Sequence, residues 1–117
     1  MKRDLLIGPH SYRLNRSDLL FSSGLCKPDT REIVVNLHRG AAYADETLFH
    51  EMFHACESAL VEAGTIEEAS AESYVESMAA LLYQTLKRNG MLCMNVEWEQ
   101  MDFDWMLRRM QRGRETP

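Results

Sequence analysis

Two histidines and a glutamate lie close together in the segment HEMFH, residues 50–54. His50 and His54 are four residues apart, so on a helix they lie one turn apart on one face and can present two imidazole nitrogens to the same metal ion. Glu51 projects beside that face, where it can reach a water molecule at the metal. This is the His-Glu-x-x-His motif, whose chemistry is two zinc ligands and a general base. The alternative is that both histidines belong to the core, where each would need a buried hydrogen-bond partner.

A catalytic zinc site takes three protein ligands and leaves one position for water, so a third ligand must come from elsewhere in the chain. The segment that follows the motif offers four glutamates, Glu67, Glu68, Glu72 and Glu76. If this segment is a helix antiparallel to the first, a rise of about 1.5 Å per residue leaves the first two short of the histidines. Glu72 and Glu76 share one face, and helix geometry does not choose between them. One would bind the metal, and the other would accept a hydrogen bond from a ligating histidine.

The hydrophobic pattern predicts the elements that position these residues. Residues 1–40 contain short apolar runs separated by Gly, Pro and Ser, which predicts an antiparallel sheet of two to four short strands. The clearest strand covers 32–37, and the turn CKPDT joins it to a neighbour within 18–25. Apolar spacings of three and four then predict helices over 45–63, 66–89 and 98–111. Strands followed by helices indicate an α+β fold, here one zincin-like domain over 1–117.

Four residues are expected to fix the ends of the first two helices. Asp45 is expected to cap the first helix, and Gly64 to end it. Thr65 and Glu68 have the spacing of a capping box, which places the start of the second helix at 66.

Composition and charge exclude several classes of function. A chain of 117 residues with a net charge of −5 has no overall electrostatic attraction for nucleic acid or anionic membranes, and its basic segment 108–114 is short and without aromatic residues. The three cysteines, Cys26, Cys56 and Cys93, form no Cys-x-x-Cys pair, which favours a reducing compartment. With no signal peptide or membrane span in the pattern, we expect a cytoplasmic protein that binds neither nucleic acid nor membranes.

The segments ETLFHEMFHACE and AESYVESMAALLYQTLKRNG resemble the ImmA/IrrE family of zinc metallopeptidases, particularly its compact phage and mobile-element members. The resemblance covers roughly residues 20–90, including the turn and strand GLCKPDTREIVVN. It implies that Glu72 is the third zinc ligand, with Glu76 as the polar residue beside it. The chain departs from the family where Glu76 replaces a common asparagine and where Tyr83-Gln84 replaces Met-Pro. The resemblance also implies a bacterial host cell and a regulatory substrate, such as a phage or mobile-element repressor cleaved at one place.

The motif therefore predicts a zinc-dependent metallopeptidase with one Zn²⁺ per chain, held by His50, His54 and a third ligand, which the resemblance implies is Glu72. Zinc lowers the pKa of a bound water, and Glu51 accepts the proton as this water attacks a peptide carbonyl. The edge of the sheet, within residues 31–38, is expected to bind an extended peptide as an added strand. Candidate donors to the developing oxyanion are Tyr43, Tyr74, His10 and His38.

The alternative function is a non-catalytic zinc module that binds a regulator or toxin partner. Such a site would need a fourth protein ligand, Cys56 or Glu57, and no general base. Cys56 is two residues beyond His54, so on a helix it points to a different face.

Overall fold

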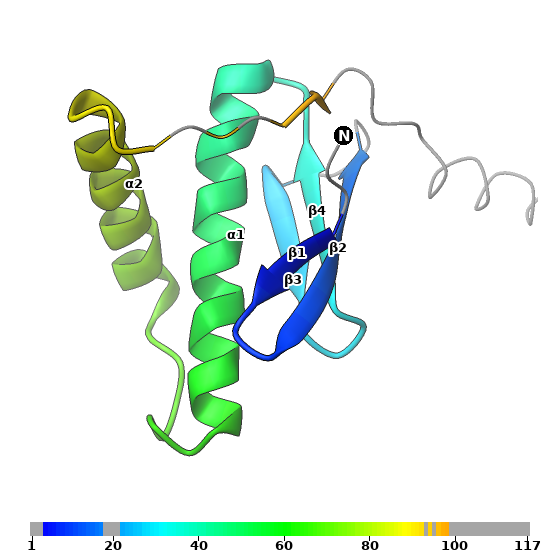
Figure 1. Ribbon diagram of the computed structural model, residues 1–117, viewed down its shortest axis with the longest axis vertical. Coiled ribbons are helices and arrows are strands. Elements are labelled where there is room, and N and C mark those ends of the chain that lie inside the picture. The colour runs from blue at the N-terminus through cyan, green and yellow to red at the C-terminus, as the bar shows by residue number, and fades with distance from the viewer. Residues whose placement is uncertain (1–3, 18–21, 93, 95, 99–117) are drawn as a thin grey trace, which may run out of the picture.

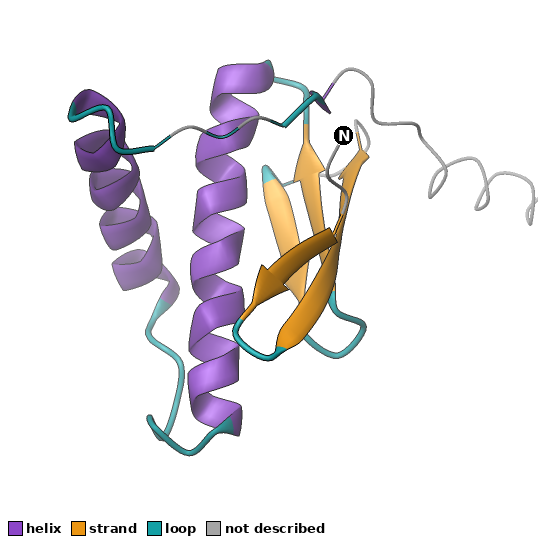
Figure 2. Ribbon diagram, viewed as in Figure 1, coloured by secondary structure: helices purple, strands orange, loops and turns teal. Residues whose placement is uncertain are grey.

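The computed structural model describes residues 4–17, 22–92, 94 and 96–98 (Figure 1). Four strands come first: β1 (Asp4–Ile7), β2 (His10–Ser17), β3 (Gly24–Lys27) and β4 (Glu32–Asn36). Two helices follow, α1 (Ala41–Glu62) and α2 (Glu72–Arg88). The elements form three layers, with α1 between the sheet and α2 (Figures 1 and 2). The predicted α+β class and the predicted number of strands are confirmed.

The sheet is mixed, so the prediction of a purely antiparallel sheet was wrong. The strand order is β1-β2-β4-β3. The β1–β2 and β3–β4 pairs are antiparallel, and the second is the predicted hairpin. β2 and β4, however, run parallel, with Arg13 opposite Glu32 and Ser17 opposite Asn36. The physical reason lies in β4, whose residues 33–35 are all fully buried, since so apolar a strand is favoured inside a sheet rather than at its edge. β3 is left as the edge strand beside α1.

α1 begins four residues before the predicted start. Gly40, with φ of 94°, precedes its first turn and makes no side-chain capping bond. Asp45 lies inside the helix, where its carboxylate accepts a hydrogen bond from the indole Nε1 of Trp98 at 2.6 Å. The carboxylate therefore holds a core residue in place, because Trp98 is 2% exposed and packs with Leu48 of α1 and with the sheet. The predicted stop is confirmed, since Gly64 adopts the left-handed conformation at φ of 76° directly after the helix.

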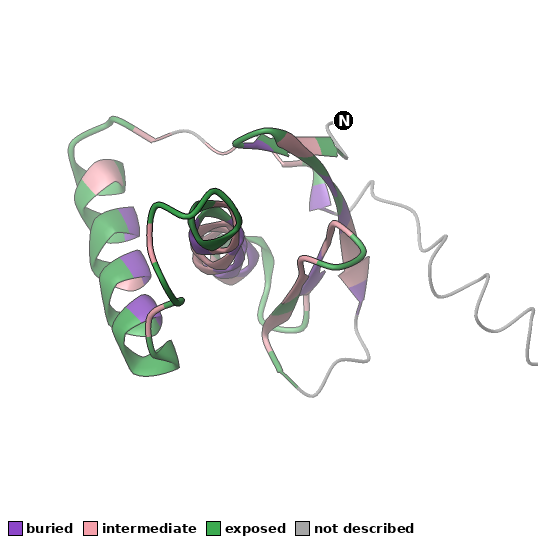
Figure 3. Cartoon of the chain, turned by 90° about the horizontal axis from the view of Figure 1, so that it is seen from below, coloured by how far each residue is buried: buried purple, intermediate pink, exposed green. Residues whose placement is uncertain are grey.

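α2 begins at Glu72, six residues later than predicted, so the capping box at Thr65 does not form. The Thr65 N–H instead donates to the Leu60 carbonyl at 2.9 Å and helps to end α1, and residues 64–71 form a connecting loop. α2 then runs antiparallel beside α1 (Figure 1). Its buried residues face α1 and most of its remaining surface is exposed (Figure 3). One contact between the helices is an edge-to-face pair of Phe49 and Tyr83, with ring centroids 5.8 Å apart.

The structure describes two helices, and the third predicted helix lies almost wholly outside the described residues. Trp98 at its predicted start is buried in the core, as expected of a packing residue. Neither α1 nor α2 combines the length and the apolarity that a bilayer-spanning helix requires.

Candidate metal centre

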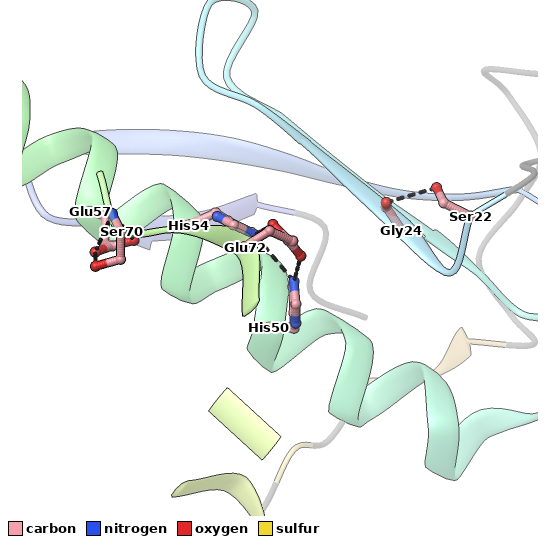
Figure 4. A network of polar contacts seen from close by, with 7 residues as sticks. All are labelled: Ser22, Gly24, His50, His54, Glu57, Ser70 and Glu72. Atoms are coloured by element: carbon pink, nitrogen blue, oxygen red, sulfur yellow. Dashed lines mark hydrogen bonds and ion pairs between the residues drawn. The ribbon is translucent and has the colours of Figure 1, made fainter. Parts of the chain in front are cut away.

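The two histidines of the motif lie on the side of α1 that faces the start of α2. Their Nε2 atoms are 3.1 Å apart, and their ring centroids are separated by 4.9 Å (Figure 4). This proximity follows from the four-residue spacing within a regular helix. Both side chains are partly exposed, 20% for His50 and 25% for His54, so the imidazole edges are open to a ligand.

Glu72, the first residue of α2, reaches both histidines. Its Oε1 lies 2.9 Å from His50 Nε2 and its Oε2 lies 2.9 Å from His54 Nε2 (Figure 4). The two nitrogens and the carboxylate thus converge on one point between the helices. The structure brings Glu72 there even though α2 starts later than predicted, because loop 64–71 covers the distance that helical turns were expected to cover.

Glu51 is almost completely buried, with 7% of its surface exposed, on the side of α1 toward β3. Together with His50 and His54 it forms a group that could hold a metal ion, with all potential ligand atoms within 4.8 Å of one another. Burial raises the pKa of its carboxyl to about 7, the negative charge of Glu72 adds to the rise, and His50 opposes it. Within the described part of the chain, no hydrogen bond to another residue satisfies this carboxylate. Glu51 is therefore a buried carboxyl with a pKa near neutrality at the edge of the site, a property common among residues of functional sites.

A buried carboxylate on the next turn of α1 holds the loop that carries Glu72. Glu57 is 8% exposed and accepts two contacts from the Ser70 N–H, at 3.2 and 3.3 Å, and one from the Ser70 hydroxyl at 2.5 Å (Figure 4). Ser70 is two residues before Glu72. The sequence interpretation considered Glu57 only as a possible metal ligand and missed this role. Its position three residues after His54, on the same helical face, was the available signal.

The site opens into two adjoining hollows. One, of about 330 Å³, extends from His50 toward Glu76 and the N-terminal half of α1. The other, of about 840 Å³, extends from His54 along β3 and loop 64–71. Gly24, Glu51 and Glu72 line both hollows. The hollows therefore meet at the candidate metal centre and form one cleft, bounded on one side by residues 22–28 and on the other by α1 and the start of α2.

Of the remaining predicted site residues, some line the cleft and others lie away from it. Glu76 lines the smaller hollow, but no hydrogen bond or ion pair between described residues joins it to either histidine. Tyr43 lines the same hollow, with its hydroxyl 3.0 Å from Ser23 Oγ. Tyr74 is 51% exposed on α2, and the His10 ring is bound to Glu62 at the far end of α1. His38 follows β4 and lines neither hollow. Of the four candidate oxyanion donors, only Tyr43 lies at the cleft.

A closed structural zinc site would need a fourth ligand, and neither candidate, Cys56 or Glu57, lies with His50, Glu51 and His54 in the group that could hold a metal ion. Glu57 is occupied by Ser70, and Cys56 is an exposed free thiol outside the cluster that the described residues form. Cys26 lines the larger hollow, but burial, supported by the charge of Glu51, raises its pKa to about 11. In the metal-free protein it is therefore a neutral thiol, and it does not belong to the group of described residues that could hold a metal ion.

Comparisons with protein-family models, with curated proteins and with solved structures gave no match to this chain. What the site can do is therefore argued from its own geometry.

Proposed function

We propose that this protein is a zinc-dependent metallopeptidase of the ImmA/IrrE type, with His50, His54 and Glu72 as ligands of one zinc ion. The observation that carries the proposal is the position of the Glu72 carboxylate, 2.9 Å from the Nε2 atoms of both histidines. Two ligand atoms about 2.0 to 2.1 Å from a tetrahedral zinc ion lie roughly 3.3 Å apart. The separations of 2.9 to 3.1 Å between these three side chains are therefore close to those of a coordination sphere.

The donor set fits zinc chemically. Two neutral imidazoles and one carboxylate are the His₂Glu combination of catalytic zinc sites with an open fourth position. No fourth ligand comes from the described residues, and the cleft gives access to the remaining side. Glu51 could also contact a metal ion held by His50 and His54. Its raised pKa and its position toward β3, however, suit it better to proton transfer than to binding the metal.

Zinc bound at this site would lower the pKa of water and polarise a substrate carbonyl. Glu51 would accept a proton from the attacking water, because burial in the metal-free protein raises the pKa of its carboxyl and makes it a stronger base than an exposed glutamate. The same carboxyl can then donate that proton to the departing amine. Tyr43, seven residues before His50 on α1, also lines the smaller hollow, and of the four candidates it is the best placed to donate a hydrogen bond to a developing oxyanion.

The first experiment is the zinc content of the purified protein, measured by elemental analysis beside Glu72→Ala and Glu76→Ala. We expect about one zinc ion per chain, lost in Glu72→Ala and largely retained in Glu76→Ala. A wild-type protein that binds no zinc after reconstitution refutes the proposal.

The second experiment asks whether the zinc-loaded protein cleaves peptides. A mixed peptide library is incubated with wild type and with Glu51→Gln, and the products are identified by mass spectrometry. We expect cleavage by wild type alone. Zinc binding by both proteins with cleavage by neither would favour the non-catalytic zinc module.

A further inference from the structure

The walls of the cleft carry an unusual concentration of one charge. Among the described residues that line it are seven glutamates and no lysine or arginine: Glu46, Glu51, Glu62, Glu67, Glu68, Glu72 and Glu76. The whole chain has 18 acidic and 13 basic side chains. The described residues include 13 acidic and seven basic side chains, so six acidic side chains and seven basic ones of this part of the chain lie outside the cleft. The excess of negative charge among the described residues is therefore located at the cleft.

Four of these carboxylates have no ionic partner within the described part of the chain. Glu51 and Glu72 belong to the proposed metal centre, and Glu62 is paired with His10 at 3.0 Å and with Arg31 at 3.4 Å. The unpaired ones are Glu46 and Glu76 in the smaller hollow and Glu67 and Glu68 in the larger one. They flank the metal centre on both sides. A substrate that crosses the centre would meet unneutralised negative charge before and after the reacting bond.

The backbone on the opposite wall suits an extended chain. β3 is one of the two edge strands of the sheet and the one that lines the cleft, whereas the prediction had placed the binding edge at residues 31–38, a segment that includes the internal strand β4. Gly24 of β3 packs so closely on α1 that a Cβ there would lie 2.7 Å from Thr47 Cγ2 and 3.1 Å from Glu51 Oε2. The buried Glu51 lines both hollows, and its carboxylate has no hydrogen bond to another described residue. The cleft thus combines a strand edge, a largely buried carboxyl group and acidic walls.

We propose that the substrate is an extended, basic segment of a protein, lying along β3 with lysine or arginine side chains on both sides of the cleaved bond. This inference rests on the proposed peptidase function and names its substrate class. Exposed ion pairs are weak singly, each changing an equilibrium constant by about 1.4- to 5-fold. Several together select a partner and accelerate its association at low ionic strength.

The test is peptide binding to zinc-loaded Glu51→Gln, which should not cleave its ligand. Three fluorescein-labelled twelve-residue peptides of alanine and glycine carry four lysines, four glutamines or four glutamates, and fluorescence anisotropy is measured in 50 and 300 mM NaCl. We expect the lysine peptide to bind most tightly and to lose affinity in the higher salt. Further replacement of Glu67 and Glu68 by glutamine should weaken it about 2- to 25-fold, two exposed pairs being lost.

The matched control, Asp4→Asn with Glu97→Gln in the same background, removes two exposed charges that line neither hollow. It should bind the lysine peptide like the parent. Equal affinity for all three peptides, or an equal loss in both double variants, overturns the inference. Zinc content is measured for every protein, so that absence of zinc in the parent refutes the proposed function, whereas a zinc-loaded protein without preference for lysine refutes only the substrate class.

Discussion

Replacing Glu57 by alanine should weaken zinc binding, although Glu57 is not a proposed ligand. Its buried carboxylate receives the N–H and the hydroxyl of Ser70, and Ser70 is two residues before Glu72. The Glu72 side chain is itself 65% exposed and gains little support from packing. The position of its carboxylate therefore depends on how firmly loop 64–71 is attached to α1.

The expected magnitude follows from the two donors. A hydrogen bond to a charged group contributes about 1.5 to 3 kcal/mol. Part of this free energy only stabilises the loop in the metal-free protein. The metal affinity is reduced only by the free energy that the variant must spend to order Glu72 when the metal binds. Residues that orient a metal ligand typically contribute about 10- to 100-fold to affinity. We expect a loss in this range for Glu57→Ala, equivalent to about 1.4 to 2.8 kcal/mol.

The assay is competition for zinc against a chromophoric chelator, with circular dichroism to show that each variant is folded. Ser70→Ala keeps the backbone N–H contact and should lose less affinity than Glu57→Ala. Ser73→Ala, an exposed serine just beyond Glu72, is the matched control and should bind like wild type. A folded Glu57→Ala protein with wild-type zinc affinity would refute the reasoning, because Glu72 would then be positioned without Ser70.

Three further predictions concern stability. In chelator-treated protein, Glu51→Gln should be more stable than wild type above pH 7 and equally stable below pH 4.5. The reason is that folding raises the pKa of the Glu51 carboxyl from 4.5 to about 7, so the wild type loses stability as this carboxyl becomes ionised. The difference should grow between these pH values to the order of 3 kcal/mol in urea titrations, and a difference independent of pH would contradict the assignment. Gly24→Ala should lower the free energy of unfolding by about 1 to 3 kcal/mol, because its Cβ would collide with Thr47, and an unchanged urea midpoint would contradict the close approach. Trp98→Ala should cost about 3 to 5 kcal/mol through the cavity it leaves and the unpaired Asp45, and a loss below 1 kcal/mol would show that Trp98 is not part of the core.

The sequence predicted the parts of the site that depend on local periodicity. His50, Glu51 and His54 are brought together by one helix, and a helical pattern is visible in the residues themselves. The approach of Glu72 to both histidines was expected from the family resemblance, whereas helix geometry left Glu72 and Glu76 equal. The structure places only Glu72 against the histidines, and the roles of both residues remain predictions until metal binding is measured.

The errors arose where distant contacts compete with local signals. Thr65 and Glu68 have a good capping sequence, yet Ser70 is bound by a carboxylate of the preceding helix, and the chain stays non-helical up to Glu72. Asp45 suits a helix cap, but its partner is Trp98, 53 residues away. The parallel pairing of β2 with β4 could not be predicted from turn residues, because these specify only neighbouring strands.

The parallel pair has a consequence for how the chain is divided. β1–β2 and β3–β4 are two local hairpins, and within the described sheet they are joined only by the pairing of β2 with β4. The second hairpin continues directly into α1, so β3, β4, Gly24 and the whole His-Glu-x-x-His helix belong to one uninterrupted stretch, residues 24–62. β3 and the helix that carries the candidate metal-binding residues thus belong to a single contiguous segment, and the first hairpin packs against it and contributes Ile7, Tyr12 and Leu14 to the core. Variation in β1–β2 is therefore expected to alter the stability of the domain more than it alters the spacing between β3, Glu51 and the two histidines.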